Sequence, residues 1–218
     1  MNNGIIVSLK NVGVQYKKRF SLKVRKSNIF WALEDISLDI HKGESIGIRG
    51  VNGAGKSTLL KVIAGIISPD RGSISTIKGI FPGLLTIRTG FNLYLNGIDN
   101  AILKGLYLGM TKEYIKSKIA DITELSGLGN AILDPVSTYS AGMLTRLSFC
   151  INYFCAPDLL LIDESLGVGD AEFKKKSSAL IHELVRSDRT VVVVSHEQEA
   201  LESLCDKIYT IEKGRILR

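Results

Sequence analysis

Runs of apolar, partly β-branched residues divide the N-terminal part of the chain into short segments. These runs predict strands at residues 4–10, 36–40 and 45–49. Between the first two, the segment KKRFSLKVRK at 17–26 alternates apolar and polar residues with a period of two, and its polar positions are mostly basic. This pattern predicts a basic two-faced ribbon, as in a hairpin arm.

Helical and strand-like patterns alternate through the rest of the chain. From Ser57, the stretch STLLKVIAGI places apolar residues at helical spacing, and SPDRGS at 68–73 ends the helix. The nearly continuous apolar runs at 158–163 and 190–196 are typical of central parallel strands that are buried on both faces. A predicted helix at 173–185 separates these two runs, which gives a β-α-β unit.

The middle of the chain, about residues 90–155, has a different character. Ile115, Ile119 and Ile122 recur at helical spacing, an Asp-Pro pair follows, and another helix is predicted to begin near Ser140. This region therefore predicts a helical insertion into the α/β core.

Together the patterns predict an α/β fold with a core of mainly parallel sheet, an N-terminal antiparallel β part and an inserted helical subdomain. We expect residues 1–218 to form a single domain. Its core would comprise about 1–88 and 156–218, and the helical subdomain about 89–155.

Composition and charge narrow the setting. The chain has 218 residues, of which 45% are hydrophobic and 23% charged, as is ordinary for a soluble α/β protein. A net charge of +6 and a pI near 9.2 favour an anionic partner, whether nucleotide, nucleic acid or acidic lipid.

Two kinds of interaction are not expected from the sequence. We expect no nucleic-acid partner, because basic and aromatic residues do not interleave as in RNA-binding domains. No stretch approaches the roughly 20 apolar residues that span a bilayer, so we expect any work at a membrane to be done from outside the lipid.

The cysteines add little chemistry. Cys150, Cys155 and Cys205 make an odd count and match no metal-ligand spacing. They predict reduced, buried thiols in a cytosolic setting.

The stretch GVNGAGKST at 50–58 carries the strongest chemical signal. Gly50, four intervening residues, Gly55, Lys56 and Ser57 satisfy the phosphate-binding loop pattern between a predicted strand and a predicted helix. The glycines let backbone N–H groups face a polyphosphate at a helix N-terminus, where the helix dipole favours negative charge. We expect Lys56 to reach the β- and γ-phosphates from an otherwise solvent-facing position, and the Ser57 hydroxyl to help hold Mg²⁺.

Acidic residues and a histidine follow the two central strands. Asp163 ends the first of these strands and is suited to a Mg²⁺ contact, and Glu164 can polarise a water against the γ-phosphate. His196 ends the next apolar run, at the edge where open parallel sheets bind ligands. We therefore expect His196 near the γ-phosphate.

The order of the phosphate loop, YSAGM at 139–143, LLLIDE and SH resembles the ATP-binding subunit of an ABC transporter, a phosphate-loop NTPase with a RecA-like core. The segment YSAGM resembles the family signature, with Ser140 and Gly142 retained and Met143 in place of the usual glutamine. The segment GVGD resembles the one that carries an aspartate reaching across a dimer, which implies that role for Asp170. The resemblance implies ATP and Mg²⁺ as cofactors. It also implies four more nucleotide contacts in the loop, namely Asn52, Gly53, Ala54 and Thr58.

Longer matches, such as FWALEDISLDIHKGE and DESLGVGDAEFKKK, resemble the ATPases of bacterial polysaccharide exporters for O-antigen, capsule and teichoic acid. The resemblance implies a homodimer in the ATP-bound state, working with an integral membrane permease. It places the protein at the cytoplasmic face of the bacterial inner membrane, as a peripheral subunit.

The alternative functions are those of an importer or drug-exporter subunit, or of a soluble ABC ATPase. The soluble class usually separates loop and signature by a long coiled coil, whereas Lys56 and Ser140 are only 84 positions apart (140 minus 56).

Two features depart from the family pattern or leave it open. Glutamine occurs only at positions 15 and 198, so the glutamine that usually senses Mg²⁺ after the first subdomain is missing. Tyr16 is the best candidate for stacking on adenine, with Phe20, Phe30 and Trp31 as competitors.

Overall fold

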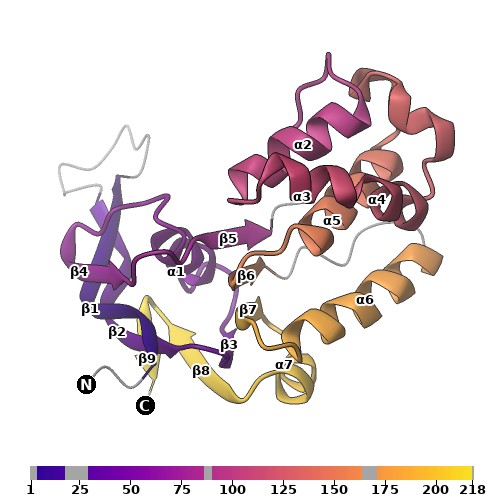
Figure 1. The fold of residues 1–218 in the computed structure, drawn as a ribbon. Helices are drawn as coiled ribbons and strands as arrows, with labels where there is room; N and C mark the ends of the chain where they lie inside the picture. Colours follow the sequence, from indigo (N-terminus) through magenta and orange to yellow (C-terminus); the bar gives the residue numbers. More distant parts are fainter. Residues whose placement is uncertain (1–3, 18–28, 86–89, 164–170, 218) are drawn as a thin grey trace, which may run out of the picture.

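The computed structural model describes residues 4–17, 29–85, 90–163 and 171–217. These residues form two β-sheets and several helices, and most of the helices lie together at one end of the molecule (Figure 1). The predicted α/β fold is confirmed by this arrangement.

A three-stranded antiparallel sheet begins the chain. Its order is β2-β1-β4, with bounds β1 Ile5–Lys17, β2 Ile29–His41 and β4 Arg71–Thr76. Val7 and Leu9 of β1 are buried, whereas Ser8 between them faces outward and donates a hydrogen bond of 2.5 Å to Asp39. This alternation with a period of two is why the predicted segments at 4–10 and 36–40 fold as strands.

The predicted basic arm joins β1 to β2. Lys17 pairs with Ile29 in the antiparallel register, so the two strands are still paired where the arm leaves them. The arm itself falls mostly on residues 18–28, which lie outside the described residues.

A six-stranded sheet forms the centre of the core, in the order β5-β6-β7-β3-β8-β9. Its bounds are β3 Ser45–Arg49, β5 Pro82–Leu85, β6 Leu159–Asp163, β7 Thr190–Ser195, β8 Lys207–Glu212 and β9 Arg215–Leu217. Neighbouring strands are parallel except for β8 and β9. The predicted strands at 45–49, 158–163 and 190–196 are confirmed, the last two one residue shorter.

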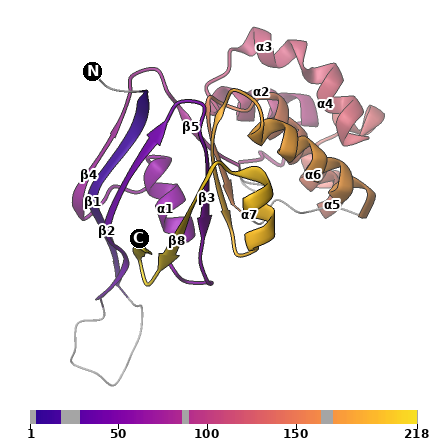
Figure 2. The same ribbon diagram turned by 90° about the horizontal axis from the view of Figure 1, so that it is seen from below.

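Both faces of this sheet are covered. Helix α1, Lys56–Ile63, lies between the two sheets, and α6, Ala171–Val185, and α7, Gln198–Leu204, cover the opposite face (Figure 2). Leu159 and Leu161 of β6 pack in the cluster with α1, and Leu160 packs in the cluster with α6 and α7. A strand buried on both faces reads as an unbroken apolar run, which explains LLLI and VVVV.

The helical part lies between β5 and β6 in the sequence. Its elements are α2 Gly97–Tyr107, α3 Lys112–Ser117, α4 Ile119–Ser126, two short 3₁₀ turns at Gly129–Leu133 and Val136–Thr138, and α5 Ala141–Phe154. Ile115 and Ile122 are fully buried in its apolar cluster. They belong to two helices that meet at Lys118.

The cysteines are free thiols. Cys150 and Cys155 are buried as expected, whereas Cys205, which we also expected to be buried, is half-buried. Burial raises the pKa of the Cys150 thiol to about 12 and that of Cys155 to about 11, which keeps both neutral. In the described part of the chain, no helix is both long enough and apolar enough to cross a membrane.

Candidate functional site

The phosphate loop lies between β3 and α1, in the strand-loop-helix context that its sequence predicted. Two of its glycines are required by close backbone contacts. A Cβ on Gly50 would lie 2.4 Å from the Ile211 carbonyl oxygen, and one on Gly55 would lie 2.4 Å from that of Ala32. Gly55 also has φ +111°, a conformation that L-residues rarely adopt. The loop therefore keeps its shape only with glycine at these positions.

Lys56 is not solvent-facing, and our expectation on this point was wrong. Its side chain is only 8% exposed, and Nζ donates hydrogen bonds of 2.6 Å to the Gly50 carbonyl and 3.1 Å to the Val51 carbonyl. The loop carbonyls attract the ammonium group and fold the side chain back over the loop. The positive charge is thus held beside the backbone that would bind a polyphosphate.

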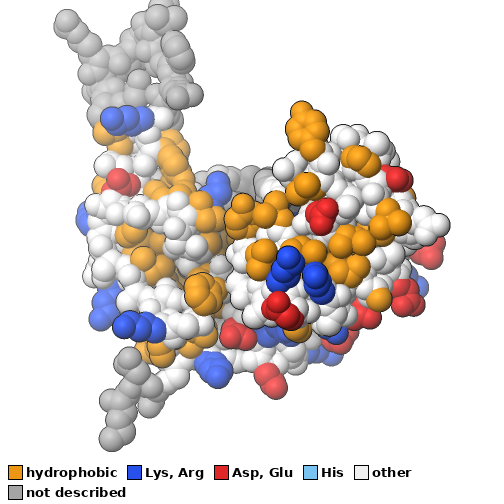
Figure 3. Space-filling view, turned by 45° about the horizontal axis from the view of Figure 1, so that its top comes forward, with side chains coloured by type: hydrophobic (Ala, Val, Ile, Leu, Met, Phe, Trp, Pro, Cys, Tyr) orange, Lys and Arg blue, Asp and Glu red, His pale blue; other side chains and the backbone are white. Residues whose placement is uncertain are grey.

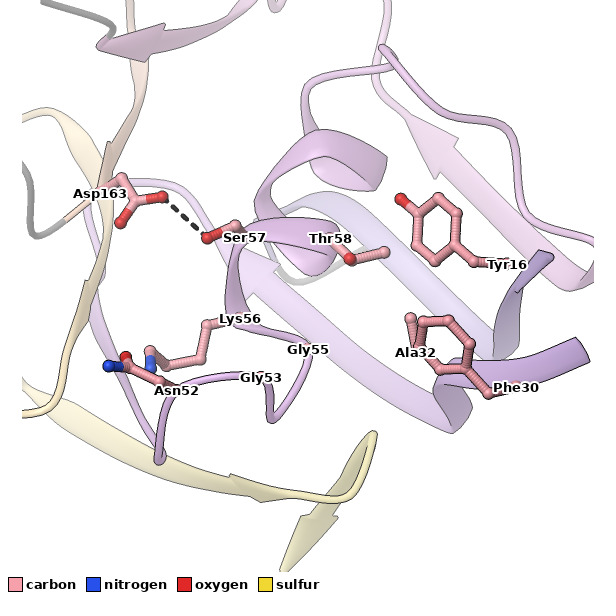
Figure 4. Close-up of a pocket in the computed structure, with 10 residues that line it drawn as sticks. All are labelled: Tyr16, Phe30, Ala32, Asn52, Gly53, Gly55, Lys56, Ser57, Thr58 and Asp163. Carbon is pink, nitrogen blue, oxygen red and sulfur yellow. Dashed lines mark hydrogen bonds between the residues drawn. The ribbon is translucent and has the colours of Figure 1, made fainter. Parts of the chain in front are cut away.

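Two side chains whose oxygen atoms could bind a metal ion lie next to this lysine. Ser57 is in the first turn of α1 and Asp163 is the last residue of β6, and the Ser57 hydroxyl donates a 3.0 Å hydrogen bond to the Asp163 carboxylate (Figure 4). Hydroxyl and carboxylate oxygens are the kind of ligands that Mg²⁺ prefers. The pair fits the expected metal site by its donor chemistry.

A cavity of about 300 Å³ opens over the loop and contains this pair. Its lining residues are Tyr16, Phe30, Ala32, Asn52, Gly53, Gly55, Lys56, Ser57, Thr58 and Asp163 (Figure 4). Most of the predicted loop contacts are therefore together. Ala54 differs, because it is buried in the core and its carbonyl accepts a hydrogen bond from the Gly214 N–H.

Among the residues that the structure describes, two aromatic side chains form a wall of this cavity, which we call the aromatic wall. The Tyr16 and Phe30 rings come from paired positions on β1 and β2, and their centroids are 5.9 Å apart at a tilt of 35°. Trp31 points elsewhere, because its ring packs under the Arg71 guanidinium at 4.7 Å. Of the β2 residues that line this cavity, Phe30 was predicted only as a competitor of Tyr16, and Ala32 was not predicted. Phe20, the remaining competitor, lies outside the described residues. The alternation of Phe30 and Ala32 along β2 was the available signal, but it becomes informative only once the strand's register is known.

His196 lines a different cavity, of about 520 Å³, next to the same loop. Arg49, Gly50 and Val51 form one wall of this cavity, and Thr210, Ile211 and Glu212 form another. The structure thus brings His196 to the start of the phosphate loop, whereas Lys56, Ser57 and Asp163 line the first cavity.

The predicted signature residues lie in the helical part. Ser140 caps the N-terminus of α5, where its hydroxyl accepts a 3.2 Å hydrogen bond from the Met143 N–H. Among the described residues that line the loop cavity, none comes from α5 or its cap. Ser140 and Gly142 are therefore not joined to the phosphate loop within one chain. Glu164 and Asp170 lie outside the described residues.

Comparison with protein families places these features in a known group. A family model described as ABC transporter matches residues 33–167. The teichoic acids export ATP-binding protein TagH of Listeria monocytogenes is 38% identical over 226 residues, covering 99% of this chain and 67% of that protein. The O-antigen export system ATP-binding protein RfbB of Myxococcus xanthus is 41% identical over 194 residues, covering 89% of this chain and 44% of that protein.

Solved structures have the same fold. The dimeric structure of MJ0796, described as a bacterial ABC transporter cassette, superposes with a TM-score of 0.76 at 22% identity, covering 98% of this chain and 97% of that one. A dimeric post-hydrolysis state of MJ0796 bound to ADP and Pi gives the same TM-score at 23% identity. The architecture around the loop is therefore that of an ATP-binding cassette.

Proposed function

The chain belongs to the ABC transporter family and is an ATP hydrolase of that family, and we propose that it drives the export of a cell-surface polysaccharide. The similarity of the chain to two proteins named for glycan export carries this proposal. Over 99% of its length the chain is 38% identical to a protein named for teichoic acid export, and a protein named for O-antigen export is 41% identical over 89% of it. The substrate class is thus a glycan polymer, such as a lipid-linked one.

Different residues of the loop cavity would bind different parts of ATP and its metal ion. The loop's backbone N–H groups and the Lys56 ammonium would contact the phosphates, and the aromatic wall would pack on the adenine. Ser57 and Asp163 would hold Mg²⁺, which when bound neutralises phosphate charge. Glu164 follows Asp163 directly and would polarise the attacking water.

We propose that two chains pair around ATP. Ser140 and Gly142 lie at the N-terminus of α5, away from their own chain's cavity, so they could contact a nucleotide bound by a second copy. A Cβ on Gly142 would meet only the Ser140 hydroxyl, at 3.8 Å, so packing within the chain does not require glycine there. Close approach of a partner would require it. Asp170 would reach across the same dimer.

The proposal also needs a membrane permease, with this chain bound peripherally at the cytoplasmic face of the inner membrane. Hydrophobic side chains gather on the surface where the sheets meet the helical part (Figure 3). A cavity of about 320 Å³ at this junction is lined by Ile66 and Tyr107, which are strongly exposed, and Phe81 is strongly exposed near Gly109. We call Ile66, Phe81 and Tyr107 the junction patch. Exposed apolar clusters of this kind support docking of another protein, here the permease.

Disruption of the gene in its own host tests the substrate. Surface polysaccharide should fall and the lipid-linked glycan should accumulate inside the cell. The wild-type gene should restore export, but Lys56→Ala, which should abolish tight ATP binding, should not. If surface polysaccharide is unchanged and transport of another solute is lost, the chain serves a different substrate.

A further inference from the structure

The Arg49 side chain connects three secondary-structure elements next to the phosphate loop, namely β3, α7 and β8. Arg49 is the last residue of β3 and directly precedes Gly50. Its Nη1 donates a hydrogen bond to the Gln198 side-chain oxygen at the start of α7, and its Nη2 donates one of 3.3 Å to the Thr210 hydroxyl on β8. One guanidinium therefore ties the phosphate-loop strand to the beginning of α7.

His196 lies between two anchored residues. On one side, the Ser195 hydroxyl accepts a 3.0 Å hydrogen bond from the Glu197 N–H, which closes a short turn around the histidine. On the other side, Gln198 is held by Arg49 and by Glu202 one helical turn further on. The sheet reinforces the arrangement, since Ser195 is the register partner of Arg49. A single side chain, that of Arg49, therefore connects the phosphate-loop strand to the turn that carries His196.

The chemistry of the contact requires arginine. Gln198 and Thr210 are neutral acceptors on two different elements, and the planar guanidinium presents donors to both at once. A lysine could donate to either acceptor but has no rigid fork to bridge them.

We propose that Arg49 is a positioning residue that holds His196 in register with the phosphate loop, an inference that rests on the proposed ATPase mechanism. Arg49 and His196 line the same cavity, together with Gly50. A fixed histidine could contact the γ-phosphate or the attacking water, whereas a displacement of about 1 Å costs on the order of 100-fold in rate.

Steady-state ATP hydrolysis by the purified full chain tests the inference. Arg49→Met should lower kcat about 10- to 100-fold and leave KM for ATP within about threefold, because the loop residues that bind phosphate remain. Arg49→Lys should recover part of kcat, and Gln198→Ala should reproduce the loss seen in Arg49→Met. Arg215→Met, which removes a surface arginine bonded to Glu34 on β2, is the matched control and should hydrolyse ATP at the wild-type rate.

A double-mutant cycle separates positioning from general support of the fold. If Arg49 acts through His196, adding Arg49→Met to His196→Ala should cause no further loss of kcat. Independent, multiplicative losses would overturn the inference, and so would an unchanged kcat in Arg49→Met or in His196→Ala. The proposed function fails by a different result, namely wild-type protein that hydrolyses no more ATP than Lys56→Ala.

Discussion

The Ser57 hydroxyl and the Asp163 carboxylate are joined by a 3.0 Å hydrogen bond across 106 positions of sequence. The strand order makes this contact possible, since β6, β7 and β3 are neighbours and their carboxyl ends reach the same edge of the sheet. Residues from two distant motifs thereby form one oxygen-donor pair beside Lys56. The same pair connects the binding loop to the strand that leads into Glu164.

Removal of the Ser57 hydroxyl should weaken the response to Mg²⁺. In Ser57→Ala, the concentration of Mg²⁺ needed for half-maximal ATP hydrolysis should rise by about tenfold or more, as happens when supporting groups of other metal sites are removed. The measurement is a Mg²⁺ titration of hydrolysis at fixed ATP. Ser178→Ala, which removes an exposed hydroxyl from α6, should behave like wild type. Equal Mg²⁺ dependence in both variants would take Ser57 out of the metal site.

Local patterns were enough to predict much of this site. The phosphate loop, Ser57 and Asp163 could be read from the sequence because each motif carries its own strand or helix signal within a few residues. The long apolar runs of β6 and β7 were readable for the same reason. The fold class followed from their order along the chain.

The parts that were missed depend on register and on short pairings. β5 has only four residues and β9 three, too few to establish a pattern, and they are strands because neighbours supply their hydrogen bonds. The folded-back position of Lys56 depends on loop carbonyls whose direction no motif specifies. Likewise, the bond from Arg49 to Gln198 spans 149 positions and leaves no local trace in the sequence.

The aromatic wall predicts the order of three substitutions. Tyr16→Ala and Phe30→Ala should each raise the Kd for ATP about 5- to 160-fold, since loss of a ring that stacks on a base costs roughly 1–3 kcal/mol. Trp31→Ala is the control on β2 and should change the Kd by less, because Arg71 covers its ring. Competition with a fluorescent ATP analogue measures all three. If the tryptophan variant loses the most affinity, adenine does not bind at this wall.

Lys104 should make the protein's stability depend on pH in an unusual window. It is 6% exposed on α2, and its Nζ donates a 2.6 Å hydrogen bond to the Ser148 hydroxyl on α5. Burial lowers the pKa of Lys104 from 10.5 to about 8 in the folded protein. Between these two pKa values the unfolded chain binds more protons, so the contribution of this lysine to stability rises with pH.

Urea denaturation of wild type and Lys104→Met tests this sign. The stability of wild type relative to the variant should increase by about 2 kcal/mol between about pH 7.5 and 9.5, because each unit of pKa shift corresponds to roughly 1.4 kcal/mol. Comparison with the variant removes the effect of the buried thiols. Lys116→Met, an exposed lysine on α3, should show no such change. A relative stability that stays constant or falls would mean that the amine is not desolvated as the structure indicates.

The junction patch should matter for coupling and not for basal hydrolysis. Tyr107→Glu places a charge on a side chain that is 77% exposed, so the isolated subunit should fold and hydrolyse ATP normally. Binding to permease-containing membranes and polysaccharide export should both fall. Leu133→Glu is the matched control, since Leu133 is 62% exposed outside the patch. Equal export by the two variants would place the permease contact elsewhere.

Glu164→Gln should trap an ATP-bound dimer, and it tests the furthest step of the proposed mechanism. The substitution keeps the shape and hydrogen-bonding capacity of the side chain but removes the negative charge that polarises water, so hydrolysis should fall while ATP binding persists. The substitution also lessens repulsion toward the γ-phosphate, which favours the closed dimer.

Light scattering after size-exclusion chromatography should therefore show that the Glu164→Gln protein is a dimer with ATP and a monomer with ADP. Adding Ser140→Arg should abolish that dimer, because the arginine would fill the space at the α5 N-terminus that the partner's phosphate needs. The matched control, Ser117→Arg on α3, should leave the dimer intact. A Glu164→Gln protein that hydrolyses ATP at the wild-type rate would show that another group activates the water, and a dimer that survives Ser140→Arg would show that YSAGM does not contact the partner's nucleotide.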